Sequence, residues 1–334
     1  MQKLSIFSFL IIVLYSVVSC TNNKFQVNVN EHIETKVYRF DQELMQIDTS
    51  NINNEIDNLY SKYPLFFPAY TYGVIGIGGR ELRDFSTNLI RFVSNNISQE
   101  VYQEVQKKYN DISDVKKDLD KALSYYHYYF PNEVIPEIYF MQSGFNQRII
   151  VDSSFIGIAL DMCLGKDSKY YNQLALPAYI KLKMNKESIS IDALRGQAWA
   201  SFAFDGEDNL ASNIIYEGKI QYFLDAMFPD KTDAQKLSYS ENDIKWVNAH
   251  EEDIWAVILQ DEMLYQTDQM KIKNMIGNAP FTQAFGNNSP AKIGVWLGWR
   301  IVKAYMNEHP EVTLQELMNN KDYISILNES NYKP

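Results

Sequence analysis

The chain has few of the residues on which most catalytic and metal-binding signatures depend. Its 334 residues include only two cysteines and four histidines. No CxxC pair, GxSxG sequence or GxxxxGK phosphate loop occurs. His250-Glu251 begins like the HExxH zinc motif, but Ile254 stands where the second histidine belongs. These absences argue against dithiol redox enzymes, P-loop proteins and standard zinc peptidases, so we expect no metal, no cofactor and no catalytic residue.

The chain also has no block of basic residues. It carries 31 Lys and Arg against 42 Asp and Glu, which gives a formal net charge of −11. Nucleic-acid binding depends on clustered positive charge, so we predict no nucleic-acid partner. No polybasic segment is available for anionic lipid head groups. Any membrane contact must therefore come from a lipid anchor.

The one long apolar run lies at the N-terminus. Lys3 is followed by a stretch without charge from Leu4 to Val18, which is typical of an export signal and short for a spanning helix. The run ends Val17-Val18-Ser19-Cys20, which resembles the lipobox of bacterial lipoproteins. The resemblance implies cleavage after residue 19 and acylation of Cys20 with fatty acids such as palmitate. An uncleaved apolar helix that happens to end in cysteine is the alternative.

Domain organisation follows from the rest of the composition. Residues 20–36 are polar and mixed, and we predict a lipidated tether there. No repeat or linker divides residues 37–334, so we expect a single domain. Cys163 lies in an apolar run and is predicted to be a buried thiol, with a nucleophile as the alternative. If Cys20 is acylated, no intramolecular disulfide can form.

Periodicity and capping patterns predict a mainly helical α+β fold. The helices expected in the first half cover about 52–60, 80–94 and 98–129. In the second half they run from an Asp208 cap to Met227, from Ser240 with Asp243 to about Tyr265, over 291–307 after Ser289-Pro290, and from Thr313 with Glu316. Three apolar runs separated by turn residues, at 137–142, 148–152 and 155–160, predict a small central mixed sheet over about 137–161.

Carboxylates on apolar helix faces are the strongest site candidates. Glu217 shares a predicted face with Ile214 and Leu224, and Glu251 lies between Val247 and Ile254. A carboxylate in such a place is costly unless it is paired or functional. We therefore take Glu217 and Glu251, with basic partners such as Arg195 or Arg300, as candidates for a cleft or a buried ion pair. Asp161, within an apolar segment, is a further candidate.

Two other patterns have a structural and a functional reading. Gly294 and Gly298 have GxxxG spacing, but Arg300 and Lys303 follow at once, so we predict close packing of soluble helices and not a membrane dimer. The aromatic run 125–130 could form a stacking surface, and a buried helix end is the preferred interpretation.

Several segments, taken together and in order, resemble the GldB family of gliding-motility lipoproteins of Bacteroidetes. The resemblance covers nearly the whole mature chain and is carried by Tyr38-Arg39-Phe40-Asp41, Tyr63-Pro64-Leu65-Phe66-Phe67, 155–162 with Leu164-Gly165, 215–219 with 222–225, 251–255, and 294–302. It implies an envelope lipoprotein connected with gliding motility and type IX secretion, whose partners are envelope proteins of that machinery. It implies no biochemical activity. Because no acidic run follows Cys20, we expect the periplasmic face of the outer membrane.

A more distant similarity is to small zinc peptidases that combine a sheet, an HExxH helix and a downstream glutamate. In this sequence the sheet would be 137–161, the active helix about 190–204 and the glutamate Glu217. The stretch from Asp192 to Ala200 contains no histidine, so the resemblance fails where zinc ligands are needed. A degenerate zincin-like fold is the interpretation that follows.

Three hypotheses for function remain open at this point. The first is a non-catalytic binding or assembly component of the motility apparatus, attached to the membrane by the lipid on Cys20. The second is a divergent metal-dependent peptidase or hydrolase that uses Glu217. The third is a periplasmic ligand-binding module with an aromatic-rich cleft, since the chain has 23 tyrosines and 5 tryptophans.

Overall fold

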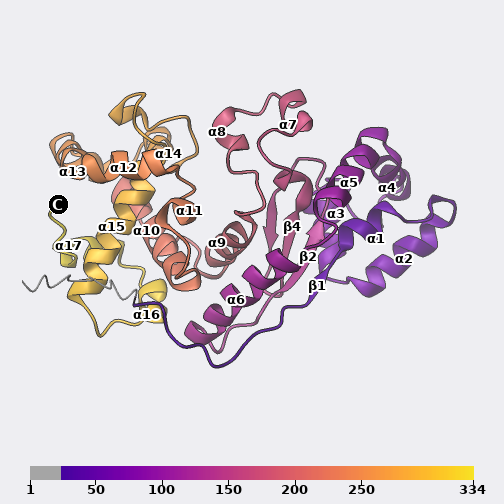
Figure 1. The fold of residues 1–334 in the computed structure, drawn as a ribbon, viewed down its shortest axis with the longest axis horizontal. Helices are drawn as coiled ribbons and strands as arrows, with labels where there is room; N and C mark the ends of the chain where they lie inside the picture. Colours follow the sequence, from indigo (N-terminus) through magenta and orange to yellow (C-terminus); the bar gives the residue numbers. More distant parts are fainter. Residues whose placement is uncertain (1–23) are drawn as a thin grey trace, which may run out of the picture.

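A computed structural model describes residues 24–334 and places helices around a small mixed sheet (Figure 1). The strands are β1 (Val37–Tyr38), β2 (Glu137–Met141), β3 (Ile149–Val151) and β4 (Phe155–Ala159), in the order β1-β2-β4-β3. β1, β2 and β4 are parallel, and β3 is antiparallel to β4. The mainly helical α+β class and the three predicted strands are confirmed. β1 was not predicted, because two residues are too few to show an alternating pattern.

The sheet is covered on both faces, so it separates two hydrophobic cores. Side chains alternate between the faces of a strand. On β2, Ile138 and Phe140 join the larger core, while Tyr139 and Met141 join the smaller one. Burial on both sides explains why β2 and β4 read as continuous apolar runs.

Five helices cover the face of the smaller core. They are α1 (Phe40–Met45), α2 (Ile52–Lys62), α3 (Phe66–Gly73), α4 (Phe85–Ser94) and α5 (Asn96–Lys108), with a 3₁₀ turn η1 (Thr49–Asn51) between the first two. Their core is aromatic: the Phe66 ring stacks on Tyr139 with centroids 4.1 Å apart, and Phe40 meets Phe66 edge-on at 5.0 Å.

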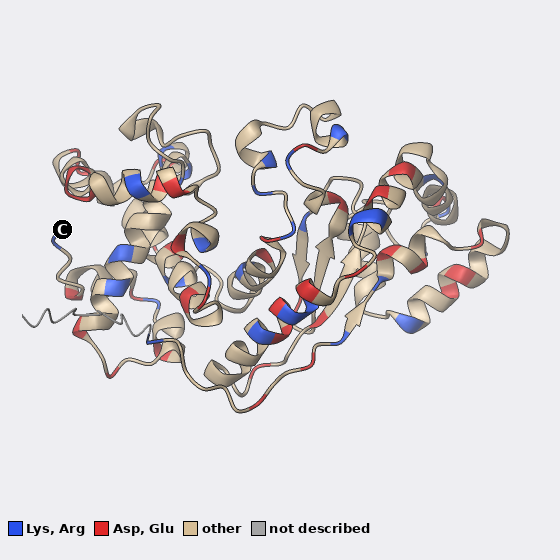
Figure 2. Cartoon of the chain, in the orientation of Figure 1, with Lys and Arg blue, Asp and Glu red and all other residues tan. Residues whose placement is uncertain are grey.

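The opposite face packs against α6 (Ser113–Tyr129) and α9 (Ile189–Ser201). Between β4 and α9 lie η2 (Leu160–Cys163), α7 (Lys169–Gln173) and α8 (Ala178–Lys181). The single helix predicted over 98–129 is wrong, since α5 ends at Lys108 and α6 starts afresh. The Asp111 carboxylate accepts from the Ser113 amide at 2.8 Å and stabilises this new start. Lys and Asp residues alternate along α6 (Figure 2), as expected for a helix with one face in solvent.

The C-terminal half forms a second, helical lobe beside α9 (Figure 1). Its elements are α10 (Leu210–Met227), α11 (Asp233–Leu237), α12 (Glu241–Ala249), α13 (Glu251–Gln260), η3 (Met263–Tyr265), α14 (Gln269–Ile276), η4 (Gln283–Phe285), α15 (Ile293–Glu308), α16 (Leu314–Asn319) and α17 (Tyr323–Glu329). α10 lies at its centre and is buried along almost its whole length. Among the helices of residues 24–334, none is long and apolar enough to cross a bilayer.

Helix boundaries test the capping predictions directly. The capping boxes of Ser240 with Asp243 and of Thr313 with Glu316 are both present. The helix that starts at Ser240 does not reach Tyr265, because His250 leaves helical geometry and its ring stacks on Trp246 at 4.2 Å. α13 then starts with three acidic residues, which suit the positive end of a helix.

Two predicted caps are wrong. Asn209, and not Asp208, caps α10 by accepting from the Ser212 amide at 2.9 Å. Ser289-Pro290 does not open α15: the Pro290 carbonyl accepts from the Thr282 hydroxyl at 2.8 Å, and the helix starts three residues later at Ile293. Thr282, in the preceding loop, therefore takes the polar groups of Ser289 and Pro290 that a cap of α15 would have used.

The segment predicted as a tether runs along the domain from Lys24 onward (Figure 1). Phe25 is buried and meets the Tyr222 ring of α10 edge-on at 5.2 Å. Further along, the amides of Ile33 and Thr35 donate to Ser124 and Asp120 of α6, both at 2.9 Å. Residues 24–36 thus connect the C-terminal lobe to the sheet.

The closest contact between elements is the crossing of α10 and α15. A methyl group on Gly298 would lie 1.7 Å from the Ile214 carbonyl oxygen, and one on Gly218 would lie 2.2 Å from the Gly298 carbonyl carbon. A Cβ on Gly294 would meet Ile214 at 3.0 Å. The packing role predicted for Gly294 and Gly298 is therefore confirmed, and Gly218 on the partner helix completes the contact.

A buried ion pair fixes α11 against the same two helices. Lys236 Nζ lies 2.5 Å from Asp225 Oδ1, and the two side chains are 4% and 7% exposed. The Trp299 indole of α15 donates to the other carboxylate oxygen at 2.7 Å. The charge of Asp225 is therefore compensated within the protein and not by water.

We predict that Gly298→Ala destabilises the protein by about 1–3 kcal/mol or more, because the added methyl group has no space between the two backbones. Urea unfolding followed by circular dichroism measures the loss. Gly73→Ala, at the end of α3, is the matched control, since no atom lies within 4 Å of the position that its methyl group would take. Equal midpoints for the two variants would show that the crossing is not tight.

Asp225→Asn should cost up to about 3–5 kcal/mol, because it removes the buried carboxylate that pairs with the Lys236 ammonium and leaves only the half-exposed Asp233, at 3.2 Å, as counter-charge. Asp230→Asn is the control: its partner Lys121 is on the surface, where ion pairs contribute about 0–1 kcal/mol. The same urea experiment compares them, and a small, equal loss in both would contradict the buried-pair interpretation.

Candidate functional site

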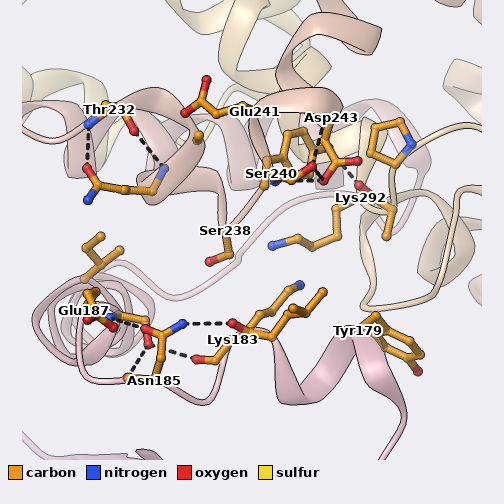
Figure 3. A pocket seen from close by; sticks show the side chains of 18 of the residues that line it. Tyr179, Lys183, Asn185, Glu187, Thr232, Ser238, Ser240, Glu241, Asp243 and Lys292 are labelled. Atoms are coloured by element: carbon orange, nitrogen blue, oxygen red, sulfur yellow. Dashed lines mark hydrogen bonds between the residues drawn. The ribbon is translucent and has the colours of Figure 1, made fainter. Parts of the chain in front are cut away.

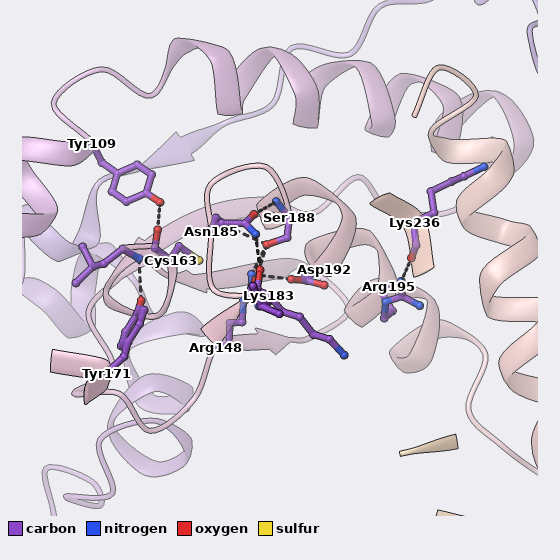
Figure 4. A network of polar contacts seen from close by, with 12 residues as sticks. Tyr109, Arg148, Cys163, Tyr171, Lys183, Asn185, Ser188, Asp192, Arg195 and Lys236 are labelled. Atoms are coloured by element: carbon purple, nitrogen blue, oxygen red, sulfur yellow. Dashed lines mark hydrogen bonds and ion pairs between the residues drawn. The ribbon is translucent and has the colours of Figure 1, made fainter. Parts of the chain in front are cut away.

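A polar cluster starts at the edge of the sheet, beside β3. Arg148 reaches α9, where its Nη2 lies 2.8 Å from Asp192 Oδ2 and also donates to Ser188 Oγ (Figure 4). The side chains of both members of this ion pair are about one-fifth exposed. Cys163 lies nearby, fully buried, and burial raises the pKa of its thiol to about 11. A buried, protonated thiol is a poor nucleophile, in keeping with its predicted structural role.

Arg195 lies one turn further along α9 and faces the C-terminal lobe. Its Nη2 donates to the Lys236 carbonyl oxygen, and Nη1 lies 3.4 Å from Gln221 Oε1 (Figure 4). Burial lowers the pKa of Arg195, while Asp192 and Glu217 act in the opposite direction. The guanidinium therefore connects α9 electrostatically to the carboxylate of α10.

Glu217 is half-buried on α10, next to the Gly218 crossing point. Burial raises the pKa of its carboxyl group, and the positive charges of Arg195 and Lys292 and a contact with Trp199 lower it. The cations whose charges act on Glu217 are thus Arg195 of α9 and Lys292, the residue that precedes α15. Arg195 was one of the basic partners proposed from the sequence, and Lys292 was not.

A cavity of about 600 Å³ opens beside this cluster (Figure 3). Lys183, just after α8, and Lys292, just before α15, both line it. Lys292 Nζ donates to the Leu237 carbonyl at 3.1 Å, and Lys183 Nζ donates to Asn278 Oδ1 at 2.7 Å. Burial is the main cause that lowers the pKa of both lysines, and the neighbouring cations lower it further.

Glu251 belongs to a different cluster. It accepts from Arg300 Nε at 2.8 Å and from the Tyr332 hydroxyl at 2.6 Å. The pairing of Glu251 with Arg300 that the sequence proposed is therefore present. No residue is shared with the surroundings of Glu217, so the two carboxylates do not form one site.

Asp161 has a third environment. It is fully buried and accepts from the amide of Ser143 at 3.0 Å and from the amide of Phe145 at 2.9 Å. Burial raises the pKa of its carboxyl group, and these amide contacts lower it. The carboxylate fixes a loop in which Gly144 and Phe145 both have positive φ. Asp161 thus holds the backbone of this loop in place, and both of its carboxylate oxygens are already occupied by hydrogen bonds.

Metal binding does not fit the groups around Glu217. Within residues 24–334, no three His, Cys, Asp or Glu side chains lie close enough together to hold a metal ion. A divalent cation at Glu217 would also be repelled by Arg195 and Lys292. Cys20, the predicted lipidation site, lies outside the described residues.

Sequence reasoning did not find the lysines of the cavity or the Asp225–Lys236 pair. Lys183 and Lys292 are isolated in sequence and lie in loops, where an exposed lysine is the ordinary expectation. The two lysines are partly buried because α8, α12 and the residues just before α15 all contribute to the wall of the cavity. No local sequence pattern indicates that these elements lie together. A lysine with φ of +58° before a helix is unusual, but only the structure shows it.

Comparison with protein families agrees with the resemblance seen in the sequence. The family model described as gliding motility protein GldB matches residues 22–334, which is nearly the whole chain. Comparisons with curated proteins and with solved structures gave no significant match. The chain belongs to the gliding-motility lipoprotein family GldB.

Proposed function

We propose that this protein is a non-catalytic binding or assembly component of the gliding-motility apparatus and its linked type IX secretion machinery. It is anchored by lipid at Cys20 to the periplasmic face of the outer membrane, and its partners are envelope proteins of that machinery. Family membership supports the connection with motility. The lipobox, Val17-Val18-Ser19-Cys20, supports the anchor.

The observation that carries the non-catalytic role is the set of cations around Glu217. In the peptidase-like layout of sheet, helix and downstream glutamate, Glu217 would be a zinc ligand. Here the charges of Arg195, on α9, and of Lys292, just before α15, both act on Glu217. Asp192, also on α9, pairs with Arg148. An ion pair thus takes up Asp192, and the positive charges near Glu217 disfavour a cation there, which supports a degenerate zincin-like fold.

The anchor is tested by replacing the native copy in a gliding host with Cys20→Ala. We expect this variant to leave the outer-membrane fraction and the cells to stop spreading, because it lacks the acyl chains and keeps its uncleaved apolar N-terminal segment. Cys163→Ala is the control, since it removes the other cysteine and keeps the lipobox. External protease should reach the wild-type protein only after the outer membrane is permeabilised. Recovery of wild-type protein in the cytoplasmic soluble fraction would contradict the proposal.

The non-catalytic role is tested with Glu217→Gln, which keeps the shape of the side chain and removes its charge. We expect spreading to continue, provided that thermal melting shows the variant protein to be folded. Metal content, measured on full-length protein purified without chelator or affinity metal, gives an independent readout. Stoichiometric zinc that is lost in Glu217→Gln, together with loss of spreading by a folded variant, would make the hydrolase hypothesis the better one.

A further inference from the structure

We propose that the cavity between α8, the α11–α12 loop and the start of α15 binds a dianionic phosphate group, held between Lys183 and Lys292. This site is independent of any motility function and of the residues around Glu251. It would make the protein a receptor for a small phosphorylated ligand or for phosphate itself.

The two lysines are arranged to share one ligand. Figure 3 shows them on opposite walls, with their ammonium groups directed toward each other across the cavity. Each has one neutral acceptor, Asn278 for Lys183 and the Leu237 carbonyl for Lys292. An ammonium group has three hydrogens to donate, so each lysine has donors to spare on the cavity side.

Charge balance favours a dianion at this place. Arg148 and Asp192 neutralise each other at the sheet edge. Lys183 and Lys292 each donate to a neutral acceptor, and neither is ion-paired with a carboxylate of residues 24–334. Glu187, Glu241 and Asp243 also line the cavity, and Asp243 accepts from the backbone amide and the hydroxyl of Ser240. No direct contact with a carboxylate of the described chain therefore neutralises the two ammonium groups. Like charges in a partly buried place repel strongly. A dianion between the lysines removes the repulsion and supplies acceptors for the spare donors, whereas a carboxylate would leave one charge over.

The shape of the cavity limits the rest of the ligand. A volume of about 600 Å³ lies within the range of small-molecule sites and exceeds what a phosphate ion fills. Tyr179, Leu182 and Pro280 contribute apolar wall, and Ser238 is one of the polar residues of the lining. The carboxylates on the lining, Glu187, Glu241 and Asp243, disfavour a long polyanion. A single phosphate monoester on a compact body fits these features best.

The test uses full-length protein in detergent, with inorganic phosphate and glycerol phosphate as probes at constant ionic strength. We expect a saturable rise in Tm with either probe and none with chloride, because a ligand that binds only the folded state stabilises it. A larger rise with glycerol phosphate assigns the site to a phosphate monoester, and equal rises assign it to free phosphate.

Lys183→Met and Lys292→Met should each lose most of the phosphate-dependent rise. Without phosphate, each variant should also have a higher Tm than wild type, because one of the two positive charges that repel each other has been removed. Lys183→Arg keeps the charge and should keep the response. Lys271→Met, on the exposed surface of α14, is the control with the same change in net charge. No saturable rise in wild type, or an unchanged rise in both methionine variants, would overturn the proposal.

Discussion

The backbone contact of α10 with α15 is the constraint on which the C-terminal lobe depends. Only glycine at 218 and 298 lets the two helices approach this closely. The contact fixes the rotation of α10, and therefore the direction of Glu217, which is adjacent to Gly218. It also fixes how α15 lies against α10, and so on which side of α10 the N-terminal end of α15, with Lys292, is placed. Two glycines thus set the position of charged groups that neither of them touches.

Close packing of these helices removes water from their polar residues, so charge must be balanced inside the protein. Asp225 does this fully, with Lys236 and the Trp299 indole at its two oxygens. The charges of Arg195 and Lys292 act on Glu217, and both cations are themselves partly desolvated. In the first case the charged groups are ion-paired within the core. In the second, Lys292 and Lys183 line a cavity without an ion-pair partner among residues 24–334, which is the physical difference between a structural pair and a site.

The sequence was sufficient for the features that are local. Helical periodicity over 52–60, the capping boxes at Ser240 and Thr313, and the apolar strands all depend on neighbours within a few residues. The features that failed depend on side-chain contacts that neither periodicity nor a capping pattern shows. Thr282 takes the Pro290 carbonyl and so delays α15, and the ring of His250 stacks on Trp246 where a continuous helix was expected. The sequence showed that Glu217 is unusual. It did not show that Lys292 acts on it, because most of the residues of the C-terminal lobe lie between the two in the sequence.

The course of residues 24–36 changes what a lipid at Cys20 implies for the position of the domain. A free tether of that length would let the domain move well away from the bilayer. Because Phe25 packs on Tyr222, only the four residues that follow Cys20 up to Lys24 remain to span the gap, and these reach at most about 14 Å when fully extended. The lipid would therefore hold the part of the C-terminal lobe around Tyr222 close to the membrane surface. The sheet and helices α1 to α5 follow later in the chain, after residues 24–36.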